Sequence, residues 1–144
     1  MKKYLVLVAI SGMCNFGAYA QDLKTSDVPA NVKSECLKKF PESSKAKVAW
    51  EKEKENYEAN WGGKSGEDNS AMFTPAGTFI EIVKAIPVSQ LPSAAIDYVK
   101  QHEKGQAIKE AGLVTDANGN VTYEAEVKGK DLIFDTNGRF LKVD

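Results

Sequence analysis

The sequence is poor in the residue types from which catalytic and metal sites are commonly built. Its 144 residues include two cysteines and one histidine. A histidine-based triad needs a serine or cysteine and a carboxylate near the ring, and a catalytic zinc site usually draws on more than one histidine. We therefore expect His102 to be a solvated residue near a helix C-terminus. The sequence predicts no metal site and no cofactor.

Long apolar runs are also scarce. Two lysines near the start precede an apolar run over residues 4–10, and Ala18-Tyr-Ala20 supplies the small-x-small pattern of a signal-peptidase site. The run is too short to cross a bilayer as a helix, which takes about 20 residues. These features predict a signal peptide over residues 1–20, cleaved after Ala20, and a secreted, periplasmic protein. A lipoprotein attached through Cys14 is the alternative.

A strong excess of one charge is missing as well. Removal of Lys2 and Lys3 with the signal leaves 17 basic residues against 20 acidic ones. That balance does not indicate the excess of basic residues that is typical of nucleic-acid-binding proteins. No second apolar stretch approaches the length of an integral membrane segment. Once Cys14 is removed, Cys36 has no partner for an intramolecular disulfide. We expect it to pack in the core as a small apolar residue and not to act as a nucleophile.

What the sequence does contain is an internal repeat. Phe73-Thr-Pro-Ala-Gly-Thr-Phe-Ile-Glu-Ile82 recurs as Phe134-Asp-Thr-Asn-Gly-Arg-Phe-Leu-Lys-Val143, with Phe, Gly and Phe in register. Each copy has the pattern of a β-hairpin with a glycine in its turn. Shorter matches lie upstream, because Tyr57-Glu-Ala59 recurs as Tyr123-Glu-Ala125. A repeat of this length predicts one supersecondary unit used twice, over about residues 27–86 and 89–144.

Each unit is predicted to consist of one helix followed by four strands. The helices, over residues 29–40 and 92–103, begin at a proline, which suits the first helical turn. Tyr123-Glu-Ala-Glu-Val127 alternates apolar and acidic residues, as a half-buried strand does. The predicted fold class is therefore α+β: one domain over residues 21–144, with an antiparallel sheet, helices on one face and the other face open. The expected strands span residues 47–53, 56–61, 70–73, 78–83, 107–115, 121–127, 131–134 and 139–143.

Two motifs that resemble ligand sites are better explained as turns. A calcium loop opening at Asp116 would need glycine at its sixth position and glutamate at its twelfth, but those positions are Val121 and Val127. Asn-Gly and Asp-x-Asn-Gly favour hairpin turns. Gly62-Gly-Lys-Ser-Gly66 lacks the full spacing of a phosphate loop, so we interpret it as a hairpin loop.

Three aromatic residues are the candidate binding residues. Trp50 and Trp61 lie on adjacent predicted strands together with Tyr57, and their side chains could face the core or the solvent. Two exposed tryptophans would form an apolar patch of about a few hundred Å², as large as the biggest patch on ordinary monomers. Core packing is the alternative interpretation.

The repeat and its motifs resemble the PepSY-like, β-lactamase-inhibitor-like family of small periplasmic proteins. The resemblance covers residues 21–144 and is strongest over residues 123–138. It implies tandem α+β units whose helices pack on one face of a curved antiparallel sheet and leave a concave face open. In the related β-lactamase inhibitors, the concave face of the sheet binds the target enzyme. No inhibitory residue can be carried over to this chain, and those inhibitors have disulfides that it cannot form.

The function predicted on these grounds is a secreted, non-catalytic binding module. It would recognise an unidentified protein or peptide of the periplasm, with an inhibitory role open, on the exposed sheet face. The alternative is a small-ligand carrier or envelope sensor with a pocket between helix and sheet. An enzyme is the third hypothesis, and it would depend on isolated carboxylates such as Glu124 and Glu126. Strand alternation predicts that this pair faces solvent, where the pKa of a carboxyl stays ordinary.

Overall fold

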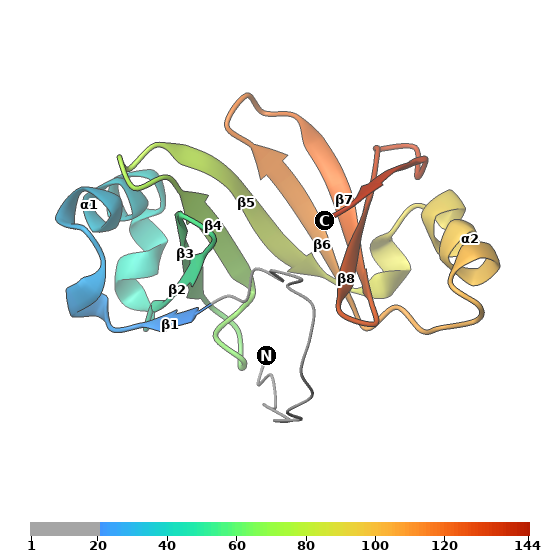
Figure 1. The fold of residues 1–144 in the computed structure, drawn as a ribbon, viewed down its shortest axis with the longest axis horizontal. Coiled ribbons are helices and arrows are strands. Elements are labelled where there is room, and N and C mark those ends of the chain that lie inside the picture. Colours follow the sequence, from blue (N-terminus) through green and yellow to red (C-terminus); the bar gives the residue numbers. More distant parts are fainter. Residues whose placement is uncertain (1–20) are drawn as a thin grey trace, which may run out of the picture.

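The computed structural model describes residues 21–144. The predictions made for residues 1–20, a signal peptide cleaved after Ala20 or a lipoprotein attached at Cys14, lie outside the described residues. The described chain folds as one nine-stranded antiparallel sheet with two helices (Figure 1). The predicted α+β class with an antiparallel sheet is therefore confirmed. The helices are α1 (Ala30–Lys39) and α2 (Ser93–His102), and the strands are β1 (Gln21–Leu23), β2 (Ala49–Glu53), β3 (Asn56–Trp61), β4 (Asn69–Phe73), β5 (Phe79–Ile86), β6 (Glu110–Asp116), β7 (Val121–Val127), β8 (Lys130–Phe134) and β9 (Phe140–Val143).

The structure differs from the sequence prediction at the sheet edge and between the units. Strand β1 was not predicted, because three residues that pair only at an edge carry no periodic pattern. Strand β5 continues to Ile86, three residues beyond the end of the predicted strand over residues 78–83. Pro29 and Pro92 are the N-cap residues and precede the first helical residue. Within residues 21–144 there are also three short 3₁₀ helices: Thr25–Asp27, Pro41–Lys45 and Val88–Gln90.

Two apolar clusters form the core, one beside each helix. Helix α1 contributes Val32 and Cys36 to the first cluster. Helix α2 contributes Ala95 and Val99 to the second. The expected core position of Cys36 is confirmed, since its side chain is buried. Each helix is therefore held to the sheet by apolar side chains spaced four residues apart, on one face of the helix.

Strand β5 joins the two parts of the sheet. It pairs with β4 on one side and with β6 on the other. Ile82 belongs to the first cluster, and Ile86 packs against the second. Residues four apart on a strand point to the same side of a sheet. Figure 1 shows α1 and α2 at opposite ends of the long axis, with β5 and β6 between them.

The repeated hairpins share their internal geometry. The rings of Phe73 and Phe79 meet edge-on with centroids 5.7 Å apart, and those of Phe134 and Phe140 do so at 6.0 Å. A register shift occurs at the first phenylalanine of each hairpin. The turn glycine, Gly138 in the second copy, has a positive φ and lies against the start of α2. A hairpin that approaches a helix N-terminus so closely leaves no space for a side chain there.

We expect Gly138→Ala to destabilise the protein clearly more than Gly119→Ala. Both glycines have φ near +80°, at +82° and +85°, and an L-residue in that region costs about 1–2 kcal/mol. A Cβ at Gly138 would also lie 2.8 Å from the Ala95 nitrogen, whereas a Cβ at Gly119 meets nothing within 4 Å. Crowding of that kind adds about 1–3 kcal/mol. Equal losses in urea denaturation of the two variants would contradict the close approach.

Candidate functional site

The two tryptophans proposed as binding residues lie in the core. The side chain of Trp50 is 5% exposed and that of Trp61 is 2% exposed, and both belong to the first cluster. Tyr57 is half-buried at the margin of that cluster, with Lys52 Nζ 4.9 Å from its ring centroid. Of the two interpretations that the sequence left open for Trp50 and Trp61, core packing is therefore correct, and these rings form no exposed patch. The physical reason is that both side chains point to the α1 side of the sheet, where Trp61 meets the ring of Phe40.

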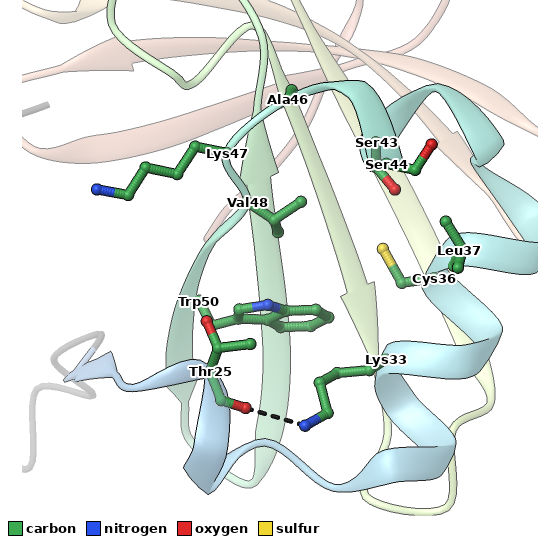
Figure 2. Close-up of a pocket in the computed structure, with 10 residues that line it drawn as sticks. All are labelled: Thr25, Lys33, Cys36, Leu37, Ser43, Ser44, Ala46, Lys47, Val48 and Trp50. Carbon is green, nitrogen blue, oxygen red and sulfur yellow. Dashed lines mark hydrogen bonds between the residues drawn. The ribbon is translucent and has the colours of Figure 1, made fainter.

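A cleft of about 390 Å³ lies between α1, the following 3₁₀ helix and β2 (Figure 2). Its walls include Cys36, Val48 and Trp50. Burial raises the pKa of the Cys36 thiol, although the side-chain hydrogen bond with Ser43 opposes this, so the thiol is a poor nucleophile at neutral pH. The cleft opens broadly to solvent. It does not have the enclosed form expected for a small-ligand carrier.

The opposite side of the sheet carries a row of carboxylates. Ala59, Ile82 and Ala125 belong to the two apolar clusters, so their strand neighbours Glu58, Glu81 and Glu124 point to the other side. The strand register places Glu58 beside Met72, Met72 beside Glu81, and Glu81 beside Asp116. We call this side the carboxylate face, defined by Glu58, Glu81, Asp116 and Glu124.

A pocket of about 190 Å³ opens on the carboxylate face where β5 to β9 run side by side. Val114 and Ile133 are buried, although they point to this side of the sheet and away from the apolar clusters. We call this pocket the Glu124 pocket. It is lined by Glu81, Val114, Asp116, Asn120, Thr122, Glu124, Ile133, Leu141, Lys142 and Asp144.

A glycine sets the position of the Glu124 carboxyl. Gly112 on β6 pairs directly with Glu124 on β7. A Cβ at Gly112 would lie 2.8 Å from Glu124 Oε1 and 2.6 Å from Val83 Cγ1. The side chain of Glu124 therefore lies across the backbone of β6, in space that any larger residue would fill, and reaches toward β5.

The Glu124 carboxyl has the largest change in pKa that we find in residues 21–144. Burial, followed by the charges of Asp131 and Glu81, raises its pKa from 4.5 to about 8. Within the described chain it forms no hydrogen bond or ion pair. The pKa of Glu81 is raised for the same reasons, burial first and then repulsion, chiefly by Asp144. At neutral pH the Glu124 carboxyl is therefore mostly protonated.

The expectation that Glu124 has an ordinary pKa is wrong. The predicted alternation is confirmed, because Glu124 and Glu126 point away from the core. The expectation is wrong because the side of the sheet that faces away from the core is not fully exposed to solvent at Glu124. Leu132, Ile133 and Phe134 form an uninterrupted apolar run in which Ile133 points to the carboxylate face. Such a run was the available signal that this face is also partly buried.

The turn motifs act as turns. One carboxylate oxygen of Asp116 accepts hydrogen bonds from the backbone N–H groups of Asn118 and Asn120, and that of Asp135 does the same for Asn137 and Arg139. The pKa of Asp116 is lowered chiefly by the Asn120 side-chain amide, which donates to the other carboxylate oxygen, and then by the backbone bonds. The pKa of Asp135 is lowered chiefly by the backbone bond from Arg139. Within residues 21–144 no group of three or more His, Cys, Asp or Glu side chains is arranged to hold a metal ion.

His102 stands apart from the site. Its ring stacks on Tyr98 with centroids 4.0 Å apart, and Nδ1 lies 2.9 Å from the Tyr98 carbonyl oxygen. The residue is exposed in the last turn of α2, as its sequence position indicated. It has no place in the Glu124 pocket.

The fold defines an α+β protein in which two helices accompany one antiparallel meander sheet. Neither helix in the described range has the length and apolar composition needed to cross a membrane. No family model and no curated protein matches the sequence.

Solved structures share this fold. A protein from Bacteroides eggerthii, provisionally named as periplasmic, has a TM-score of 0.63 at 18% identity, covering 81% of this chain and 88% of its own. A DUF2874 family protein from Bacteroides ovatus has a TM-score of 0.61 at 18% identity, covering 81% and 86%. A BLIP-like protein from Bacteroides fragilis has a TM-score of 0.57 at 17% identity, covering 81% and 84%. These likenesses show an α+β fold that this chain shares with a BLIP-like protein.

Proposed function

We propose that this chain is a secreted, periplasmic, non-catalytic binding module that recognises a protein or peptide on its carboxylate face. The observation that carries the proposal is the Glu124 pocket, where an unpaired, partly buried carboxyl stands beside buried apolar side chains. An isolated polar group with a strongly altered pKa in a pocket is a marker of functional sites. The BLIP-like relative in fold supports a protein as the partner.

The proposed architecture consists of two tandem units in one domain over residues 21–144. Both helices then cover the same side of the sheet, since Ile82 and Ile86 point to one side of β5 and meet the α1 and α2 clusters in turn. The carboxylate face is the open face in this arrangement. Secretion is supported by the signal-peptide pattern over residues 1–20 and by the name of the Bacteroides eggerthii relative in fold.

The pocket size favours binding over catalysis. Several carboxylates line one pocket, as an acid–base enzyme would require, and Glu81 and Glu124 are the pair with raised pKa values. Small-molecule sites, however, typically occupy roughly 300–1,000 Å³. A pocket of about 190 Å³ accommodates a single side chain better than a substrate with its reacting bond. The sheet around it provides the wider surface that a protein partner needs.

Photo-crosslinking in the periplasm tests the proposed face. A benzophenone amino acid is placed at Met72 or Thr122, which point to the carboxylate face, and in matched controls at Lys38 or Lys100, exposed on the two helices. We expect both carboxylate-face positions to give an adduct with the same partner polypeptide, and the helix positions to give none. Adducts of equal yield from the helix positions, or no adduct at Met72 and Thr122, would contradict the proposal.

A further inference from the structure

The charges of the Glu124 pocket do not balance. It is lined by the carboxyl groups of Glu81, Asp116, Glu124 and Asp144 and by one ammonium group, that of Lys142. That ammonium already bonds to Asp144, with Nζ 2.6 Å from Oδ2. Asp116 accepts three hydrogen bonds within its own turn. Within the described chain neither Glu81 nor Glu124 forms an ion pair; the Lys142 ammonium lowers the pKa of Glu81 only in part, against burial and the charge of Asp144.

The Glu124 pocket also has apolar side chains beside its carboxyl groups. Val114 and Ile133 are buried, and Leu141 is 45% exposed beside them. Apolar side chains next to carboxylates suit a lysine or arginine, because such a residue lays its methylene stem on apolar surface while its charged end reaches a polar group. A neutral peptide would use the apolar part and leave Glu81 and Glu124 unpaired, which is costly for buried polar groups.

We propose that the Glu124 pocket receives a lysine or arginine side chain of the partner protein, with the charged group bonded to Glu124 and Glu81. This inference rests on the proposed function and specifies its partner as one that presents a basic side chain. A charge-assisted hydrogen bond to a carboxylate is about twice as strong as a neutral one, so a single inserted residue can anchor a wider interface.

The proposal implies that binding releases a proton. In the free protein burial raises the pKa of Glu124 to about 8, and Glu124 is also repelled by Asp131 on β8, Glu81 on β5, Glu58 on β3 and Asp144 just after β9. A cation in contact with the carboxyl favours its charged form and lowers that pKa. Binding of a basic side chain therefore strengthens as the pH rises through 8, until Glu124 in the free protein is fully ionised. The remaining charged groups at the pocket are Asp116 on β6 and Lys142 on β9.

The test is an NMR titration with single amino-acid probes. N-acetyl-lysine methylamide is added to the isotope-labelled protein at pH 6.5 and pH 8.5, and N-acetyl-norleucine methylamide, which lacks the ammonium group, is the matched probe. We expect the lysine probe to shift the amides of Thr122, Glu124 and Ile133, and its affinity to rise about tenfold between the two pH values. The norleucine probe is expected to give at most a tenth of that affinity at pH 8.5.

Two substitutions make the test specific. Glu124→Gln preserves the side-chain shape and is expected to weaken the lysine probe about tenfold at pH 8.5 and to remove the pH dependence. Thr122→Lys places an ammonium group within the same pocket, on the same side of β7 as Glu124, and is expected to exclude the probe. Equal affinity for lysine and norleucine, or unchanged lysine affinity in either variant, would overturn the proposal.

Failure of this inference can be told apart from failure of the proposed function. The Met72 crosslink is repeated in the Glu124→Gln protein, where we expect the adduct yield to fall. An undiminished adduct there would overturn the cationic anchor and leave the binding face intact. Absence of an adduct in the unsubstituted protein counts against the proposed function alone, because the amino-acid probes measure the pocket without the partner.

Discussion

Trp61→Ala is expected to lower the free energy of unfolding by about 3–5 kcal/mol, the range found for buried tryptophan and phenylalanine truncations. The Trp61 ring is 2% exposed and packs on Phe40 with centroids 5.4 Å apart. A domain of this size is typically stable by about 5–15 kcal/mol, so the variant loses a large share of its stability. Urea denaturation followed by far-UV circular dichroism measures the loss without depending on tryptophan emission.

Trp61→Phe is the matched control. In the described chain the indole Nε1 of Trp61 is buried and has no hydrogen-bond partner. An unsatisfied buried donor costs about 1–3 kcal/mol, so removing it offsets part of the packing that the smaller ring loses. We expect a net change of less than about 1.5 kcal/mol in Trp61→Phe. A similar stability of Trp61→Ala and the wild type would contradict the core assignment.

Substitutions at the two buried tryptophans are unsuitable for locating a binding surface. Alanine substitutions at Trp50 and Trp61 would weaken partner capture by unfolding the protein, since both rings belong to the first cluster. Substitutions on the carboxylate face, such as those at Thr122 and Glu124, alter the candidate site and leave that cluster untouched.

Glu124→Gln is expected to stabilise the protein at alkaline pH and to have little effect in acid. The pKa of Glu124 is raised from 4.5 to about 8 in the folded state, so the folded state binds the proton more tightly than the unfolded state. Between these values the unfolded state releases the proton first, and stability falls as the pH rises. Below pH 4.5 both states are protonated and the difference vanishes.

The size of this effect follows from the difference in pKa. One unit corresponds to about 1.4 kcal/mol, and because Glu124 keeps some solvent contact we expect about 2–4 kcal/mol at pH 9. Denaturation curves at pH 5, 7 and 9 measure it, with Glu126→Gln as the control. Glu126 lies on the same strand and pairs with Lys109 at 3.6 Å, so its loss should change stability by less than about 1 kcal/mol at each pH. A pH-independent effect of Glu124→Gln would rule out the buried, protonated carboxyl.

The repeat explains why much of the fold could be predicted from sequence. Phe73 and Phe134 recur in register and are both fully buried. Each meets the second phenylalanine of its own hairpin, Phe79 or Phe140, edge-on. The helices predicted to begin at Pro29 and Pro92 match the observed ones to within one residue at each end. Local patterns of this kind depend on neighbours a few residues apart, which the sequence shows directly. Strand β1 escaped prediction because its pairing with β2 depends on contacts far along the chain.

The candidate site could not be predicted in the same way. Strand alternation separates Glu124 from the core residue Ala125, but it does not tell how much water reaches either side. Similarly, the sequence placed Trp50 and Trp61 on neighbouring strands without saying which side α1 would cover. The wrong expectation for Glu124 and the open question for the two tryptophans both concern burial, a property that several strands and a helix create together.

By itself, therefore, the sequence determined the α+β class, the repeated hairpin and the turns at Asp116 and Asp135, because backbone propensity and residue periodicity act over short distances. Only the tertiary structure decided that the two tryptophans are core and that Glu124 is the unusual carboxyl. Burial within the sheet desolvates Glu124, and its charge is repelled by Glu58, Glu81, Asp131 and Asp144, which lie on four other strands or at their ends. Those groups come together only when the sheet has formed.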